Sequence, residues 1–262
     1  STSLKSIDVS GFDTSKVVNM NGMFWECSNL TSIDVSNFNT SKVTDMNNMF
    51  AECSNLITLD LSNFDTSNVI YMGNPYSYSY GGMFRNCSSL KELNVSSFDT
   101  SKVKQMSNMF DGCSSLTTLD LSNFDTSNVT AMASMFEKCT SLKNLNLFNF
   151  DVSSVTDMSF MFCNCSKLLN LDLSSFKESK VTTTRQMFGG CKSLETLNIS
   201  NFDTSNVTSM VQMFRGCSSL TTLDLSNFNT SKVTNMYGVF SGCSNLKSIN
   251  LSSFDTSNVI NM

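Results

Sequence analysis

Hydrophobic and polar positions recur along this chain in a fixed order. In the stretch LTTLDLS (116–122), leucines alternate with polar residues, which predicts a short half-buried strand. In VTAMASMFEKC (129–139), the apolar residues fall within a stripe of roughly 120° at about 100° per residue, which predicts a short helix with one apolar face. The connecting SNFDTSN (122–128) carries the residue types of turns and helix N-caps.

This unit repeats every 26 residues. One leucine column contains Leu4, Leu30, Leu56, Leu90, Leu116, Leu142, Leu168, Leu194, Leu220 and Leu246. Each step is 26 residues except the 34 from Leu56 to Leu90. Because one unit cannot cover its own apolar face, stacked units share a core. The pattern predicts an α/β repeat solenoid of the leucine-rich-repeat type over residues 1–262. Its parallel sheet is expected on the concave side and its short helices on the convex side, since helices need more room.

The long step contains an insertion, GNPYSYSYGG, at residues 73–82. Its glycines and proline are turn formers that let the chain leave the repeat and return. An extended backbone places Tyr76, Tyr78 and Tyr80 on one face, ~6.5 to 7 Å apart. Tyrosine and serine are favoured together in binding loops, so these three tyrosines form one candidate ligand site. The alternative is a surface insertion without a role, which solenoids tolerate.

A second candidate site is the outward side of the predicted strands. Its central column alternates acid and amide from Asp60 onward, and its candidate ligand-binding members are Asp120, Asn146, Asp172, Asn198 and Asp224. Alternation separates carboxylates by roughly 10 Å, near the ~8 Å screening length at physiological salt. The neighbouring column contains mainly Ser, Thr and Asn, and such a small, uniform polar surface suits extended or multivalent contact with a glycan or a fibrous protein.

A metal site is the weaker interpretation of the same column. Calcium would fit best where Asp8, Asp34 and Asp60 follow one another without an amide between them. No glycine-rich loop or bidentate glutamate accompanies these aspartates. Management of charge repulsion explains the column without a metal.

Composition narrows the functional classes. The chain has no histidine, which excludes Ser-His and Cys-His nucleophiles, and no phosphate-binding glycine motif. We therefore expect no enzyme and no cofactor. A net charge of −5 with 15% charged residues argues against nucleic-acid binding. No run approaches the ~18 apolar residues of a membrane span. The chain also has neither a signal peptide nor polar capping repeats, so we expect a fragment of a longer protein or ends that stack on another molecule.

Nine of the ten cysteines occupy one column, from Cys27 to Cys243. This column lies on the apolar stripe and lacks metal-ligand spacing, which predicts small buried residues rather than disulfides. Cys163 lies outside it, in a column of very different residue types. That variety predicts an exposed free thiol at Cys163.

The repeat resembles known families. The MFxxCxxLxxLxL core is similar to the BspA-like leucine-rich repeats, and LSNFDTSNVTxMxxMF resembles the repeats of uncharacterised surface proteins from mycoplasmas and firmicutes. The resemblance implies a secreted or cell-surface protein linked to adhesion, and it implies no particular ligand.

Three functional hypotheses follow. The favoured one is a cell-surface binding or adhesion module for a protein or glycan on a host cell or matrix. The alternative is a structural spacer, or a filament formed by self-association through the uncapped ends. A third is an ice- or mineral-binding face built on the regular Thr and Ser columns.

Overall fold

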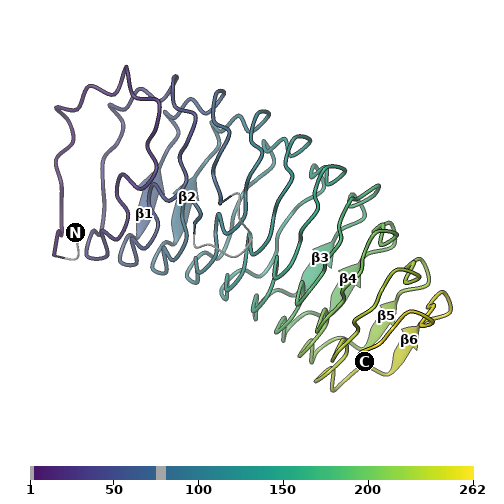
Figure 1. Ribbon diagram of the computed structural model, residues 1–262. Helices are drawn as coiled ribbons and strands as arrows, with labels where there is room; N and C mark the ends of the chain where they lie inside the picture. The colour runs from purple at the N-terminus through teal and green to yellow at the C-terminus, as the bar shows by residue number, and fades with distance from the viewer. Residues whose placement is uncertain (1–2, 75–80) are drawn as a thin grey trace.

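The computed structural model describes residues 3–74 and 81–262 as a stack of similar coils. Each coil lies against the next, and the two ends of the chain lie at opposite ends of the stack (Figure 1). The predicted repeat solenoid is therefore confirmed. Tyr76, Tyr78 and Tyr80 lie outside the described residues.

In the part of the chain that the structure describes, six short strands follow one side of the stack. They are β1 (Thr58–Asp60), β2 (Glu92–Asn94), β3 (Asn170–Asp172), β4 (Thr196–Asn198), β5 (Thr222–Asp224) and β6 (Ser248–Asn250). They pair in parallel as β1–β2, β3–β4 and β5–β6, each in the register that the repeat predicts, with Leu59 opposite Leu93 in the first pair. The central residue of each strand points inward and its two neighbours are exposed, because successive strand residues face opposite sides.

The predicted helices are wrong. In the described residues the VTxMxxMF segment forms a second parallel ladder, whose bridges run from Asn19 to Asp45 and on, repeat by repeat, to Asn261. The amides of Met132, Ser134 and Phe136 donate to carbonyls one repeat further on, at 2.8–3.3 Å. Every second amide of this segment therefore links two coils instead of closing a helical turn.

Tight turns fill the positions between these links. Met135 donates to the carbonyl of Met132, and Cys139 to that of Phe136. Most repeats place two residues in the left-handed region here, such as Ser134 at φ 56° and Lys138 at φ 58°. Apolar spacings of three and four residues suit such three-residue turns as well as a helix. A segment of eleven residues would also gain little from an isolated helix, since helix nucleation is costly.

Two phenylalanine columns fill the core. In the column that includes Phe110, Phe136 and Phe162, neighbouring rings stack at 5.4–6.1 Å between centroids, with interplanar angles of 2–18°. From Phe50 to Phe214 these rings are fully buried. Offset stacking adds about 0.5–1.5 kcal/mol per pair beyond area burial, so this column fixes the spacing of the coils from within.

A column of buried hydroxyls provides a further link between coils. The Thr126 Oγ1 donates to the carbonyl of Asp151 at 2.7 Å and accepts from the amide of the same residue at 2.8 Å. Thr40 and Thr230 make the same double contact with Asp65 and Asp255. A threonine side chain thus satisfies a backbone donor and a backbone acceptor that the ladders do not reach.

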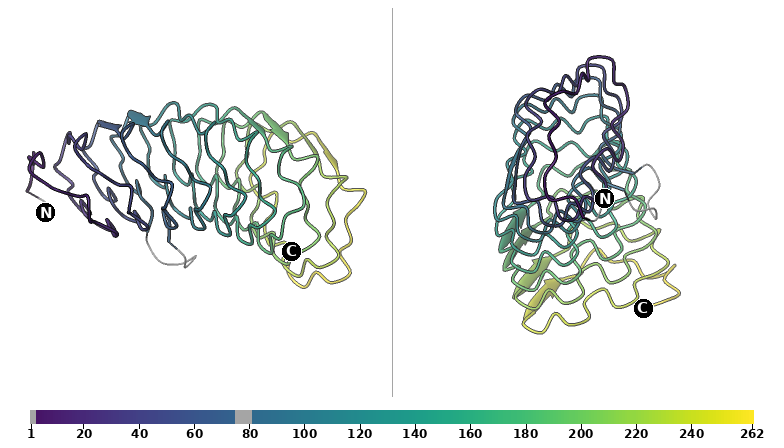
Figure 2. Two further views of the ribbon diagram at one scale, coloured as in Figure 1. Left: turned by 90° about the horizontal axis from the view of Figure 1, so that it is seen from above. Right: turned by 90° about the vertical axis from the view of Figure 1, so that its left-hand side faces the viewer.

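The curvature also differs from the prediction. Seen from above, the stack is an arc with the strand arrows along its outer edge (Figure 2, left). The concave placement of the sheet was inferred from helices that need more width than strands. Without helices in the described residues, both sides are spaced by parallel ladders, and that reason no longer applies.

The strand face as a candidate binding site

We define the strand face as the surface made by the outward residues of β1 to β6 and of the equivalent segments between them. Its acidic members are held by the chain itself. Asp172 accepts a hydrogen bond from the amide of Ser174 at 2.8 Å, and Asp120 and Asp224 do the same with Ser122 and Ser226. This contact orients the carboxylates by a turn that every repeat shares.

The same contacts keep these carboxylates charged. The Ser174 amide, the Ser174 hydroxyl and then the Asn198 side chain hold the pKa of Asp172 below its ordinary value. Hydrogen bonds from Ser122 lower the pKa of Asp120 in the same way. The strand face therefore presents alternating negative and neutral groups at neutral pH.

The acid–amide alternation has a structural role that the sequence analysis missed. Asn198 donates to Asp172 at 3.0 Å, and Asn94 donates to Asp60 at 3.1 Å. An amide placed one repeat after a carboxylate thus binds it across the strand pair, in addition to diluting the charge. The side-chain oxygens of Asn198 and Asn94 in turn accept hydrogen bonds from the backbone amides of Ser200 and Ser96.

The structure brings three of the five predicted residues together. A hollow of about 480 Å³ opens on the strand face across β3, β4 and the preceding segment, and its lining includes Asn146, Asp172 and Asn198. Asp224 borders a smaller hollow of about 120 Å³ that also touches Asn198. Asp120 lies on the same face but borders neither hollow. The candidate site is therefore centred on residues 144–198.

In the described part of the chain, no group of at least three His, Cys, Asp or Glu side chains is placed so that it could hold a metal ion. Asp8, Asp34 and Asp60 each accept a hydrogen bond from the serine amide two residues on, at 2.9–3.0 Å. Their contacts are those of the acids along the rest of the column.

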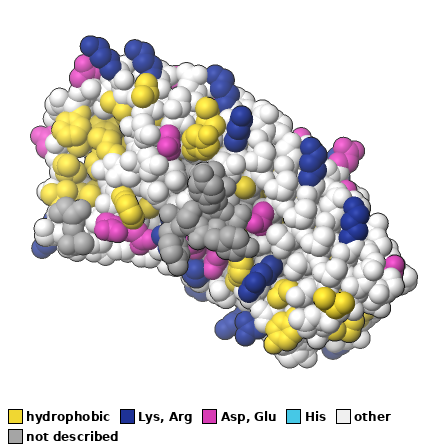
Figure 3. All heavy atoms as spheres, in the orientation of Figure 1, with side chains coloured by type: hydrophobic (Ala, Val, Ile, Leu, Met, Phe, Trp, Pro, Cys, Tyr) yellow, Lys and Arg dark blue, Asp and Glu magenta, His cyan; other side chains and the backbone are white. Residues whose placement is uncertain are grey.

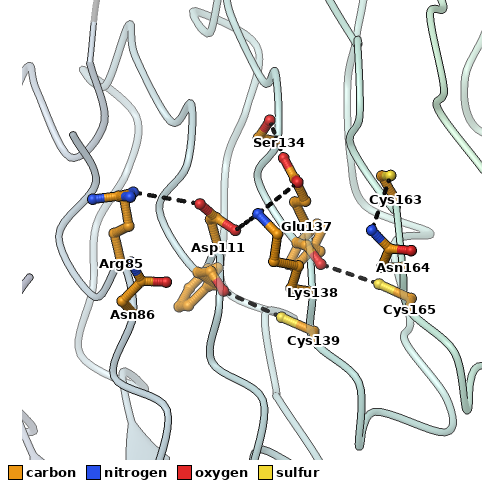
Figure 4. Close-up of polar contacts among 12 residues, drawn as sticks. Arg85, Asn86, Asp111, Ser134, Glu137, Lys138, Cys139, Cys163, Asn164 and Cys165 are labelled. Atoms are coloured by element: carbon orange, nitrogen blue, oxygen red, sulfur yellow. Dashed lines mark hydrogen bonds and ion pairs between the residues drawn. The ribbon is translucent and has the colours of Figure 1, made fainter. Parts of the chain in front are cut away.

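A second polar cluster runs along the turns (Figure 4). Arg85 pairs with Glu52 and lies 3.4 Å from Asp111, and Lys138 lies 3.6 Å from Asp111 and 2.7 Å from Glu137. Burial raises the pKa of Asp111 to about 6 against the opposing influence of the two cations. These charges mainly satisfy one another, which indicates a link between repeats.

Cys163 is buried rather than exposed, so the prediction of a surface thiol is wrong. Its Sγ lies 3.7 Å from the Gln186 Oε1, and burial raises its pKa to about 12. The column was judged exposed from its variety of residue types. In the stack, however, the column is mixed: Ala51, Asp111 and Cys163 are buried, whereas Trp25, Arg215 and Ser241 are exposed.

The main cysteine column is buried as predicted, apart from the half-buried Cys243. All ten cysteines are free, and each thiol from Cys53 onward in the column donates to a phenylalanine carbonyl at 3.0–3.2 Å. The thiols are thus small core residues that also satisfy backbone acceptors.

Sequence reasoning did not single out a further hollow of about 450 Å³ beside Phe148. The Phe148 side chain is 80% exposed, in a column where the other nine repeats have serine. That departure from the column was the available signal. The backbone amide of Phe148 donates at 3.1 Å to the side chain of Asn146, which lines the strand-face hollow.

Apolar atoms also gather towards the two ends of the stack (Figure 3). At the end of the last repeats, a hollow of about 680 Å³ is lined by Tyr237, Phe240, Phe254 and Met262 among others. At the first repeat Phe12, Val18 and Trp25 are half exposed. Both end surfaces are thus more apolar than the strand face.

Residues 3–74 and 81–262 contain no helix with the length and hydrophobicity needed to cross a membrane.

No curated protein matches the chain. Among solved structures, a leucine-rich cell surface protein from Faecalibacterium prausnitzii is similar at 19% identity and a TM-score of 0.39, over 95% of this chain and 73% of that one. A leucine-rich-repeat protein from Bacteroides ovatus has 18% identity and a TM-score of 0.31, over 99% and 87%. The Leptospira interrogans protein LIC12759 has 16% identity and a TM-score of 0.37, over 88% and 57%.

A family model matches the whole length of the sequence, in three overlapping stretches at residues 1–81, 78–197 and 183–262. Its description is "Mycoplasma protein of unknown function, DUF285". The three stretches together span the coils described above, including the two phenylalanine columns, the cysteine column and the hydroxyl column. The chain belongs to the family described as Mycoplasma proteins of unknown function, DUF285.

Proposed function

We propose that the chain is a non-catalytic binding module of a secreted or cell-surface bacterial protein. The strand face would present its polar columns to a glycan or fibrous protein on a host cell or matrix. The observation that carries the proposal is the hollow over β3 and β4, where amide, carboxylate and hydroxyl groups project from a rigid backbone.

The chemistry of this hollow favours a polar ligand. Its walls contain three asparagines besides Asn198, together with Asp172 and Thr196, around a floor of leucines. Several groups already bond to one another, such as the Thr196 hydroxyl with the Asn170 Oδ1. Side chains held in this way lose little rotamer entropy when a ligand binds, which favours several weak contacts within this hollow.

The test compares two matched double variants. Asn144→Ala with Thr196→Ala changes the lining of the hollow, whereas Thr58→Ala with Glu92→Ala changes the equivalent outward positions of β1 and β2. Binding is measured on an array of immobilised host glycans and on surfaces coated with collagen or fibronectin. We expect the first variant to lower binding about tenfold and the second to leave it unchanged. The proposal fails if the wild-type chain binds none of these probes, or if both variants lose binding equally.

The tyrosines of the insertion are a second contact in this proposal. Replacing Tyr76, Tyr78 and Tyr80 by serine should lower binding to the same probes without changing the melting temperature. Unchanged binding would confine the site to the strand face.

End-to-end association is the second candidate function, that of a spacer or filament. The apolar hollow beside Phe240 and Phe254 and the half-exposed Phe12 and Trp25 support it, since the two end surfaces are of similar character. Light scattering across a concentration series tests it. Growth of long oligomers would favour this candidate, and a constant mass of 28.9 kDa would count against it.

A further inference from the structure

We propose that the hollow beside Phe148 is a carbohydrate subsite that takes one neutral pyranose ring of a glycan, with the Phe148 ring as its stacking platform. This inference rests on the proposed binding function and assigns a ligand class and a location to it. Single exposed apolar residues are ordinary on protein surfaces, so the argument depends on what surrounds this one.

The hollow lies where the link between coils changes. In eight neighbouring pairs of repeats, a buried threonine or serine hydroxyl donates to a carbonyl of the following repeat. Val152 occupies the hydroxyl position in the repeat that contains Phe148, and it has no group that can form this bond. The side-chain hydrogen bond that joins other neighbouring coils is therefore missing at Val152, and the hollow of about 450 Å³ opens beside this position.

The following repeat has a different turn at the equivalent position. Lys177 stands where the other nine repeats have Asp or Asn, so it cannot accept the amide that caps the usual turn. Ser179 takes over the buried slot and donates to the Asp203 carbonyl at 2.7 Å. Glu178 is exposed and has a left-handed backbone, with φ at 55°. Among the described residues, every other non-glycine residue with a positive φ lies in one of the two columns that include Ser134 and Lys138. Two charged side chains are thereby moved to the rim of the hollow.

These rim groups are available to a ligand. Among the described residues, neither Lys177 nor Glu178 takes part in an ion pair, and Asp151 uses one carboxylate oxygen for the Ser153 amide. Ser153 and Ser174 also line the space, and the Ser174 hydroxyl already bonds to Asp172. Hydroxyls, a carboxylate and an ammonium around one exposed ring can bond the equatorial hydroxyls of a sugar while its axial C–H groups lie on the ring face. That packing is favourable because an aromatic face carries partial negative charge.

The charges and the volume select the ligand class. Asp151, Lys177 and Glu178 together leave one net negative charge on the lining, which disfavours an acidic sugar. A hollow of about 450 Å³ falls within the ~300–1,000 Å³ of small-ligand sites. Phe148 is the one exposed aromatic of this lining, since Phe150 is buried, and one exposed ring among polar groups suits a sugar better than a protein interface, whose hot spots are clustered and desolvated. The Asn146–Phe148 contact joins this subsite to the strand face, so further sugars of one chain would extend along β3 and β4.

The decisive variant is Phe148→Ser, because serine is the residue of all nine equivalent positions and the fold accepts it there. Phe148→Trp keeps the platform, and Tyr237→Asn removes another exposed aromatic as a matched control. The probes are chitohexaose and cellohexaose, titrated into ¹⁵N-labelled protein and followed by amide shifts. We expect shifts at residues 148–153 and 174–178, about tenfold weaker binding in Phe148→Ser, and unchanged or tighter binding in Phe148→Trp.

The other outcomes separate the two proposals. If the Asn144→Ala and Thr196→Ala variant loses sugar binding while Phe148→Ser keeps it, the strand face binds sugar and the Phe148 subsite is refuted. If Tyr237→Asn weakens binding as much as Phe148→Ser, the effect is not specific to this hollow and the subsite is also refuted. If neither oligosaccharide binds the wild-type chain while collagen or fibronectin does, the subsite is refuted and the binding module stands.

Discussion

The hydroxyl column makes the sharpest prediction about what holds the coils together. Thr126 is 1% exposed, and its Oγ1 both donates to and accepts from the backbone of Asp151, at 2.7 and 2.8 Å. In Thr126→Val the shape of the side chain is nearly kept, but one buried amide and one buried carbonyl lose their partner. Each such loss costs about 1–3 kcal/mol, so we expect the variant to lower the free energy of unfolding by about 3 kcal/mol.

Urea unfolding followed by far-UV circular dichroism measures this change, and amide hydrogen exchange at Asp151 shows where it acts. The matched control is Thr118→Val, since Thr118 is exposed and its side chain should matter by no more than about 0.5 kcal/mol. Thr126→Ser keeps the hydroxyl and should retain most of the stability. If Thr126→Val falls within about 0.5 kcal/mol of Thr118→Val, the hydroxyl links do not stabilise the stack and the reasoning is refuted.

Three further predictions concern thiols, charge and backbone space. Because burial raises the pKa of the column thiols, a thiol reagent at pH 8 should label the native protein slowly, and half-buried Cys243 should react first. In urea the reagent should label all ten cysteines at once, whereas rapid labelling of several thiols in the native protein would contradict this prediction. The pKa of Asp111 is raised to about 6 from 3.8, so its contribution to stability is full below pH 3.8 and is lost as pH rises through 6. The difference in unfolding free energy between wild type and Asp111→Asn should therefore change by up to about 3 kcal/mol across that range. A difference that does not vary with pH would refute the raised pKa. Gly82→Ala should destabilise the protein by about 1–3 kcal/mol, because the added Cβ would lie 2.1 Å from the Asn108 carbonyl oxygen. Gly11→Ala is the control, since its added Cβ would have no atom within 4 Å. Equal melting temperatures for the two variants would show that the backbone at Gly82 shifts without cost.

Register was the most predictable feature of this chain. The fixed spacing of leucine, phenylalanine and cysteine is enough to predict a stack of coils with a shared core, and the buried columns agree with it. A strict period predicts which residues lie above one another whatever the local conformation is. For that reason the paired strands also have the predicted register.

Local conformation was less predictable. Apolar residues spaced by three and four satisfy both a helix and a series of tight turns, and hydrophobic periodicity cannot separate the two. The informative positions are those of Asn108, Gly112 and Gly190, whose left-handed backbones favour glycine and asparagine. Such residues recur in the segment and are poor helix formers, so their recurrence was evidence against a helix.

The candidate site was predicted in part. Asn146, Asp172 and Asn198 were chosen from their column, and they line one hollow. The hollow itself could not be predicted, since a uniform column gives no reason to prefer the middle repeats. The departures at Phe148 and Lys177 carry that information, and their meaning depends on which residues the stack brings together.

The continuous ladders also have a mechanical consequence. A pull applied to the two ends acts along the stack and across the bonds between coils, from the Asn19–Asp45 bridge to the Asn235–Asn261 bridge. These bonds would open one coil at a time, and each released coil of 26 residues would lengthen the chain by roughly 90 Å at ~3.5 Å per residue. In the proposed role of a binding module on a cell surface, such a stack would extend stepwise under load and limit the peak force on the bound ligand.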